Sequence, residues 1–286
     1  MKAGLTIGLF ALIFLGSCQW NSKKQLRTEE SDSLPVDTLA YAELKEVFQA
    51  RFDSLEAEYE TAGEDRRHEL ESTYEIIDLE QVQAQRQFIR DYPASNISLS
   101  VLEELDWSFE SASELNEYLE VLHTSLHSQK AYQDLEKLAA RMEQVEVGKK
   151  APDFTMVDVE GNAHRLSDHH KASEYLFLDF WASHCGPCRL ENKNIRKAYS
   201  LYHEKGFDVL GVSTDTRREH WLGAIDMDSL SWTNLCSLME WKENEVVQLY
   251  ALRQTSQNFL LDRSGNIIAT ELRGKDLLST LDSLLH

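Results

Sequence analysis

The sequence is short of positive charge and of cysteine, and its N-terminal apolar run is brief. Its 286 residues hold 29 lysines and arginines against 49 aspartates and glutamates, a net charge of −20. This imbalance argues against nucleic acid as a partner, because phosphates are bound by lysine and arginine. The apolar run from Leu5 to Leu15 falls short of the roughly 20 residues that a permanent membrane span needs. Four cysteines, two of them in one close pair, do not suggest a disulfide-stapled scaffold.

The N-terminus indicates a targeting segment rather than part of a fold. Lys2 precedes the apolar run, which ends in Leu15-Gly16-Ser17-Cys18. This ending resembles the lipobox of bacterial lipoproteins, in which the cysteine is lipidated and becomes the first residue. An ordinary signal peptide with a cysteine near its end is the alternative. We expect a lipoprotein signal peptide over 1–18 and a flexible polar tether over 19–38. Gln19, which is not acidic, favours the outer membrane by analogy with bacterial sorting.

The acidic charge is concentrated in the first half of the chain. Residues 32–147 hold 27 acidic and 9 basic side chains, a net charge of −18, whereas residues 148–286 hold 20 and 16, a net charge of −4. Residues 39–146 contain one proline, one glycine and apolar positions at helical spacing. Ser111 followed by Glu114 is a capping-box signal for one of these helices. We therefore predict an acidic, all-helical domain over 39–146 and a second domain over 147–286.

The second half alternates between strand and helix patterns. A continuous apolar strand is predicted at 175–180 and a helix at 187–205. Another apolar strand is expected at 207–213, and a hairpin joins strands at 258–261 and 267–270. A helix over 275–285 closes the chain. The pattern predicts an α/β fold with a mixed sheet covered by helices on both faces.

The chemistry-bearing motif is Cys185-Gly186-Pro187-Cys188, at the junction of a buried strand and a helix. The first cysteine falls at the helix N-terminus, where unpaired N–H groups and the helix dipole favour a thiolate. Pro187 is tolerated in the first turn, because its missing N–H would be unpaired there. A zinc site of this kind takes two such pairs, and the sequence has one. We predict that Cys185 is the nucleophile and that Cys188 resolves the mixed disulfide.

The segment Asp179-Phe180-Trp181-Ala182-Ser183-His184-Cys185-Gly186-Pro187-Cys188-Arg189-Leu190-Glu191 resembles the active site of thioredoxin-like proteins, and more narrowly the TlpA/ResA-like thiol–disulfide oxidoreductases. The similarity covers about residues 147–286. Gly148 to Phe154 resembles the opening shared with redoxin and peroxiredoxin relatives. The resemblance implies a thioredoxin-like fold that reduces protein disulfides in the bacterial envelope. It implies no metal or organic cofactor and a membrane electron donor.

The resemblance also assigns roles to single residues. Asp179 matches the buried carboxylate that takes a proton as the second thiol attacks. Glu191 matches an acid placed near the pair; a solvated helix residue is the equal alternative. Trp181 and Gly186 belong to the surroundings of the active site.

Three positions depart from the family pattern. His184 replaces the usual tryptophan, and it stabilises the thiolate if charged or is only a turn residue if neutral. Asn192 replaces a common proline, with little consequence expected. Ser256 stands at the position of the usual cis-proline. A cis bond before a residue other than proline costs roughly 3 kcal/mol, so we predict that the Thr255–Ser256 bond is trans.

Two other functions are alternatives to thiol–disulfide exchange. A thiol peroxidase would need a proline and a threonine or serine where the chain has Leu178 and Ala182. A non-catalytic envelope adaptor is motivated by Ser256 and by the acidic helices. Cys236 is expected to be a core thiol, with an auxiliary redox cysteine as the alternative.

Overall fold

The computed structural model describes residues 34–285, so the predicted signal peptide and Cys18 lie outside the described residues. The chain forms two compact units, the first ending at Phe88 and the second starting at Ile89. The domain limits expected at residues 38 and 146 stay predictions. No helix within 34–285 combines the length and the apolar character needed to cross a membrane.

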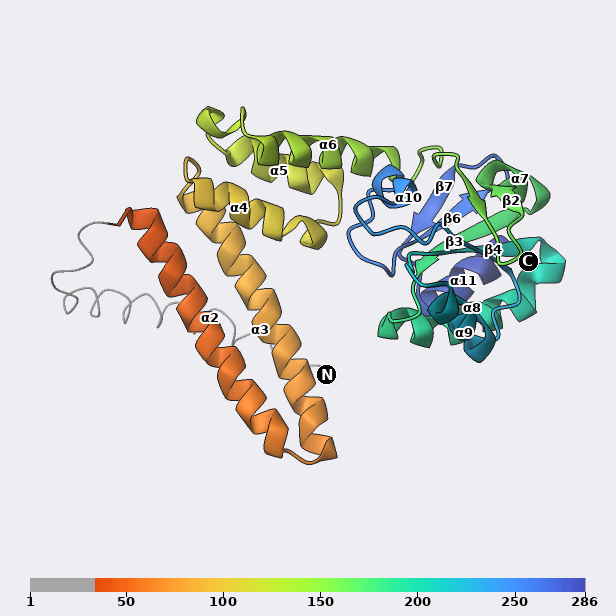
Figure 1. Ribbon diagram of the computed structural model, residues 1–286, viewed down its shortest axis with the longest axis horizontal. Coiled ribbons are helices and arrows are strands. Elements are labelled where there is room, and N and C mark those ends of the chain that lie inside the picture. The colour runs from red at the N-terminus through yellow and green to blue at the C-terminus, as the bar shows by residue number, and fades with distance from the viewer. Residues whose placement is uncertain (1–33, 286) are drawn as a thin grey trace, which may run out of the picture. The chain divides into compact units, whose positions relative to one another are not determined.

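The first unit contains two long antiparallel helices, α2 (Val36–Thr61) and α3 (Glu64–Asp91), and the last residues of α3, from Ile89, belong to the second unit (Figure 1). Aromatic contacts join them at two levels. The rings of Phe52 and Tyr74 lie 4.8 Å apart, and those of Tyr41 and Phe88 lie 5.1 Å apart. Helix α3 ends two residues before Pro93, since the residue before a proline disfavours helical backbone.

The second unit begins with three further helices and two short 3₁₀ turns. Ser95 caps the first of them by accepting a hydrogen bond from the Ile97 N–H. Ser111 accepts one from the Glu114 N–H at 3.2 Å, and the Glu114 carboxylate in turn accepts from the Glu110 N–H. These side chains satisfy N–H groups that helix starts leave unpaired. The elements are α4 (Asn96–Glu104), η2 (Asp106–Ser108), α5 (Ala112–Val121), η3 (Thr124–Leu126) and α6 (Lys130–Gln144).

A five-stranded mixed sheet forms the rest of the second unit, with the strand order β5-β4-β3-β6-β7. β3 pairs in parallel with β4 and antiparallel with β6, so it lies at the centre. A separate hairpin of β1 (Thr155–Val157) and β2 (Ala163–Arg165) precedes it. The sheet strands are β3 (Tyr175–Trp181), β4 (Phe207–Ser213), β5 (Thr233–Cys236), β6 (Asn258–Asp262) and β7 (Ile267–Thr270). The helices are α7 (Leu166–Ala172), α8 (Gly186–Tyr202), η4 (His203–Lys205), α9 (Arg218–Asp228), α10 (Glu245–Leu249) and α11 (Gly274–Leu284).

Both faces of the sheet are buried, as the apolar run in β3 predicts. Alternate β3 side chains enter different cores, because successive residues of a strand point to opposite faces. Phe177 packs with side chains of α8, α9 and α11, whereas Leu178 and Phe180 pack on the side of α10. Burying one such side chain contributes roughly 1.5–3 kcal/mol. The expected thioredoxin-like fold, with a helical region before it, is confirmed by this strand order and by the helices that flank the sheet.

Candidate active site

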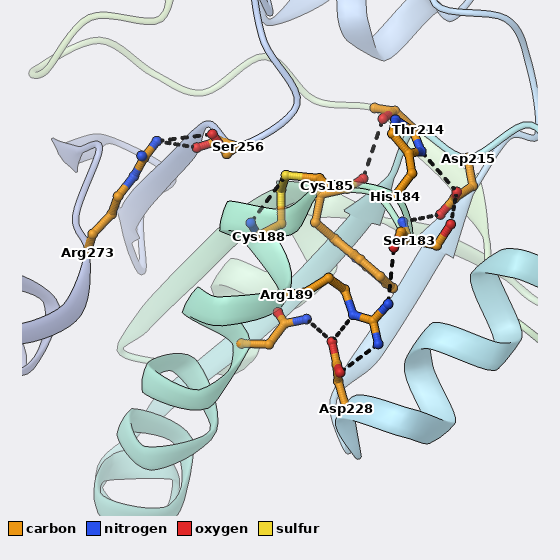
Figure 2. Close-up of a disulfide and its surroundings, with 12 residues drawn as sticks. Ser183, His184, Cys185, Cys188, Arg189, Thr214, Asp215, Asp228, Ser256 and Arg273 are labelled. Atoms are coloured by element: carbon orange, nitrogen blue, oxygen red, sulfur yellow. Dashed lines mark hydrogen bonds and ion pairs between the residues drawn. A yellow bond between two sulfur atoms is a disulfide. The ribbon is translucent and has the colours of Figure 1, made fainter. Parts of the chain in front are cut away.

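Cys185 and Cys188 form a disulfide at the start of α8, just after the central strand (Figure 2). Cys185 is the N-cap residue, and its Sγ accepts a hydrogen bond from the Cys188 N–H at 3.2 Å. Cys185 is half-buried and Cys188 is 6% exposed. After reduction, the helix N-terminus favours a thiolate at Cys185. An incoming sulfur therefore reaches Cys185 more readily than Cys188.

The turn before Cys185 is fixed by Asp215, which follows β4 and is 3% exposed. Ser183 donates its N–H to Oδ2 of Asp215 at 2.9 Å and its hydroxyl to Oδ1 at 2.6 Å. The hydroxyl of Ser213 donates to the same carboxylate at 2.8 Å. The sequence reasoning missed Asp215. In the sequence, Asp215 is recognisable as a polar residue just past an apolar strand. Because this strand, β4, runs parallel to β3, the two strands end at the same edge of the sheet.

His184 and Trp181 take opposite positions around this turn. The His184 side chain is 72% exposed, and its Nδ1 lies 3.8 Å from Oδ1 of Asp215. Trp181 is 1% exposed and packs in the core with Cys188 and α8 side chains. His184 can thus contact a partner molecule, whereas Trp181 is packed in the core at the end of β3.

Asp179 lines a cavity of about 270 Å³ together with Cys188. Burial raises the pKa of the Asp179 carboxyl to about 7, and the nearby negative charge of Glu191 acts in the same direction. The positive charge of Arg273 opposes this rise. Because its pKa lies near neutrality, Asp179 can both accept and release a proton at physiological pH. The structure thus brings the predicted carboxylate and the second cysteine to one cavity.

Glu191 lines the same cavity, and both its carboxylate oxygens are engaged. Oε1 accepts a hydrogen bond from the Gly274 N–H at 2.7 Å, and Oε2 accepts from Nδ2 of Asn194 at 2.9 Å. Gly274 is the first residue of α11, so Glu191 caps that helix with a negative charge. Glu191 thus joins α8 to α11 and places a negative charge at the cavity that Cys188 and Asp179 also line.

An ion pair that was not predicted from the sequence joins α8 to α9. Arg189 forms an ion pair with Asp228 through Nε and Nη2 and donates from Nη1 to the carbonyl oxygen of Ser183 at 3.1 Å. Asn192, expected to have little consequence, is 1% exposed and donates from Nδ2 to Asp228 at 2.7 Å. Arg189 therefore fixes the turn before Cys185 from the opposite side to Asp215 (Figure 2).

Residues 253–257, here called the Ser256 loop, reach the same cavity through Ser256. Within residues 34–285 no peptide bond is cis, so the Thr255–Ser256 bond is trans as predicted. The side chain of Gln257 accepts hydrogen bonds from the N–H groups of Arg253 and Gln254. The loop thus has internal hydrogen bonds and a trans peptide bond before Ser256.

Cys236 ends β5 and is 2% exposed. Its thiol donates to the carbonyl oxygen of Asp215 at 3.2 Å, and burial raises its pKa. A buried thiol with a raised pKa is a poor nucleophile, so Cys236 fits the expected core position. Among residues 34–285 no three histidine, cysteine or acidic side chains are grouped to hold a metal ion.

Comparison with known proteins gives matches to the C-terminal part of the chain. Residues 147–270 match the model of the AhpC/TSA family. This match covers less than half of the chain and lies within its C-terminal part. It is 27% identical to the thiol–disulfide oxidoreductase ResA of Geobacillus thermodenitrificans over 143 residues, which cover 49% of this chain and 79% of ResA.

Two solved structures are similar in sequence to about half of the chain. The thioredoxin domain of a Bacteroides vulgatus thiol–disulfide oxidoreductase is 35% identical, with 49% of this chain and 99% of that one covered and a TM-score of 0.46. A Bacteroides fragilis thiol–disulfide oxidoreductase is 34% identical, with 48% and 100% covered and a TM-score of 0.45. The similarity to ResA and the Cys185–Cys188 pair identify this protein as a thiol–disulfide oxidoreductase of the ResA kind.

Proposed function

We propose that this oxidoreductase reduces disulfides of proteins in the bacterial cell envelope. One observation carries the proposal. The accessible sulfur of Cys185 sits at a helix N-terminus, while Cys188 shares a cavity with a carboxyl whose pKa is about 7. A nucleophile, a resolving thiol and a proton acceptor thus lie within one site. The proposed roles are attack for Cys185, resolution for Cys188 and proton transfer for Asp179.

The first step uses the reduced pair. The Cys185 thiolate attacks one sulfur of a substrate disulfide, a new S–S bond forms, and the other substrate sulfur leaves as a thiolate that takes a proton. The α8 N-terminus stabilises the attacking thiolate, and Asp215 and Arg189 keep the turn before it in place. An exposed His184, when protonated, adds a positive charge beside the nucleophile.

The second step releases the substrate. Cys188 gives its proton to the Asp179 carboxylate, and its sulfur attacks Sγ of Cys185. The Cys185–Cys188 disulfide forms, the mixed disulfide breaks, and the proton returns to the departing substrate sulfur. Two electrons pass to the substrate, and the pair is left oxidised, as the structure shows it. A dithiol electron donor in the membrane must then reduce the pair again.

The proposed location is the periplasm-facing side of the envelope, with lipid on Cys18 as the anchor. The support is the sequence Leu15-Gly16-Ser17-Cys18 after a short apolar run, followed by a polar segment of about 20 residues. Gln19 favours the outer membrane. Labelling cells with a palmitate analogue tests this part, because a Cys18→Ala variant should lose the label and its membrane association. A wild-type protein without label would contradict the anchor.

A trapping experiment tests the exchange function. A Cys188→Ser variant cannot resolve, so Cys185 should accumulate mixed disulfides with envelope proteins that reducing gels release. The matched controls are the double variant Cys185→Ser and Cys188→Ser, which should trap nothing, and Cys236→Ser, which should behave as the wild type. Discrete adducts would also identify substrates and the electron donor. Failure of Cys188→Ser to form adducts would favour the adaptor alternative.

The reduction potential decides the direction of electron flow. A reductase should have a Cys185–Cys188 potential near that of thioredoxin, about −270 mV, whereas a strong oxidant lies at about −120 mV. Equilibration with glutathione or dithiothreitol buffers gives the value. A potential near the oxidant end would overturn the reductase assignment and leave the exchange chemistry standing. Slow peroxide consumption by the reduced protein would dispose of the peroxidase alternative.

A further inference from the structure

Arg273 is a basic side chain at the cavity beside Cys188. It was not predicted from the sequence, and the exchange steps above give it no role. It is the N-cap residue of α11, and it lines the cavity that holds Cys188, Asp179 and Ser256. From Nη2 it donates to the Ser256 carbonyl oxygen at 2.6 Å and contacts the Ser256 hydroxyl at 3.3 Å (Figure 2). The same nitrogen lies 2.9 Å from the carboxylate of Glu271.

The backbone that carries Arg273 is itself held tightly to β6. Asn258, 3% exposed, donates from Nδ2 to the Leu272 carbonyl oxygen at 3.0 Å and accepts at Oδ1 from the Leu272 N–H at 2.9 Å. Glu271 donates its N–H to the Asn258 carbonyl oxygen and has a φ of 54°, in the left-handed region. A residue other than glycine rarely adopts that region, so the surroundings must enforce it. The guanidinium therefore projects from a fixed base.

We propose that Arg273 is a positioning residue for thiol–disulfide exchange, which holds the Ser256 loop beside Cys188 by binding the Ser256 carbonyl group. The proposal rests on the proposed function. The hydrogen bonds inside the loop join the Gln257 side chain to Arg253 and Gln254, and the guanidinium supplies a separate donor to the Ser256 carbonyl oxygen. Glu271 orients that donor.

Electrostatics give Arg273 a second effect on the site. Its positive charge lowers the pKa of Asp179, against burial and against the charges of Glu191 on α8 and Glu271 before α11. Removing the charge should therefore move the ionisation of Asp179 to higher pH. The two effects are separable, because lysine keeps the charge but carries it on a flexible stem in place of the rigid guanidinium, whose Nη2 contacts both Ser256 and Glu271.

Three variants of the whole protein test the proposal. Arg273→Met removes charge and donors but keeps an apolar stem, and Arg273→Lys keeps the charge. Arg263→Met is the control, since Arg263 makes a surface ion pair with Glu174 at 2.7 Å on another loop, with side chains 62% and 55% exposed. Steady-state reduction of a protein disulfide, with dithiothreitol as donor, gives KM and kcat against pH. Hydrogen exchange of the amides of residues 253–257 reports the loop without any turnover.

The expected result separates the variants. Arg273→Met should raise KM about fivefold, the effect of losing one charge-assisted hydrogen bond, and should move the acidic limb of the kcat profile to higher pH. Arg273→Lys should restore the limb but not KM. Exchange at 253–257 should accelerate in Arg273→Met and not in Arg263→Met.

Unchanged hydrogen exchange in the Ser256 loop of Arg273→Met would overturn the proposal, and so would an equal rise of KM in Arg263→Met. Absence of turnover in the wild type would refute the proposed function instead, and hydrogen exchange would still decide the role of Arg273. A folding defect in Arg273→Met would show as faster exchange throughout the sheet, and it would count against a role confined to the loop.

Discussion

Replacing Asp179 with asparagine should stabilise the folded protein at neutral pH and slow exchange at the same time. Burial raises the pKa of this carboxyl from its ordinary value of 3.8 to about 7. A raised acid pKa means that the folded state holds the proton more tightly than the unfolded state. Between those two values, rising pH ionises the unfolded chain first, so the folded state loses relative stability. Above pH 7 the loss stays constant, and below pH 3.8 it vanishes.

The magnitude follows from the size of the pKa difference. Each pKa unit corresponds to about 1.4 kcal/mol, so the carboxyl destabilises the fold by about 4 kcal/mol at pH 8 and by about 1.5 kcal/mol at pH 5. Asparagine has nearly the same shape and no charge to bury. Oxidised Asp179→Asn should therefore exceed the wild type in free energy of unfolding by amounts of that order. Exchange should slow by roughly 10²–10⁴-fold, because Cys188 loses its proton acceptor.

Urea unfolding of both oxidised proteins at pH 4, 5, 7 and 8 measures the first effect, and stopped-flow release of substrate thiol measures the second. Asp262→Asn is the control, for which we expect the opposite change in the free energy of unfolding. Although burial would raise the pKa of Asp262, hydrogen bonds from Asn266, Ser264 and Gly265 lower it, so this variant should lose stability at neutral pH. A stability difference for Asp179→Asn that does not change between pH 5 and pH 8 would refute the reasoning.

Further predictions concern the supports of the site. Glu191→Gln keeps an oxygen that can accept from the Gly274 N–H but removes a negative charge that raises the pKa of Asp179. The acidic limb of the kcat profile should therefore move to lower pH. A limb that stays in place or moves to higher pH would contradict this. Arg189→Met leaves the partly buried carboxylate of Asp228 without its ion-pair partner. It should lower the free energy of unfolding, measured by urea unfolding, by roughly 2–3 kcal/mol. An unchanged free energy of unfolding would show that solvent replaces the guanidinium. Gly211→Ala would place a Cβ atom 2.5 Å from Oδ1 of Asn234 and 3.1 Å from Nε1 of Trp181, so it should destabilise the protein by roughly 1–3 kcal/mol. Its control is Gly223→Ala, which meets open space in α9 and should stabilise by roughly 0.5–1 kcal/mol; equal thermal midpoints for the two alanine variants would contradict the steric argument.

Local patterns in the sequence predicted the elements and the reacting pair. The apolar run at 175–180 indicated a central strand, because a strand buried on both faces has no polar alternation. The CxxC pair after it indicated a helix N-terminus, where Cys185 is found. Ser111 and Glu114 marked a helix start, and α5 begins at Ala112. These features depend on neighbours within one or two turns of chain, so adjacent residues suffice to predict them.

Contacts between distant segments were decided only by the tertiary structure. Asp215 reaches Ser183, Glu191 reaches Gly274, and Arg273 reaches Ser256, each across 17 or more positions of sequence. A single sequence does not show which acidic or basic side chains meet, because surface carboxylates and buried ones look alike in it. The pKa of Asp179 is raised because the folded chain buries its carboxyl, and Glu191 can cap α11 because the fold places the two side by side. The chemistry of the cysteine pair was therefore predictable from its local setting, whereas the groups that orient and tune it depend on how the folded chain brings remote residues together.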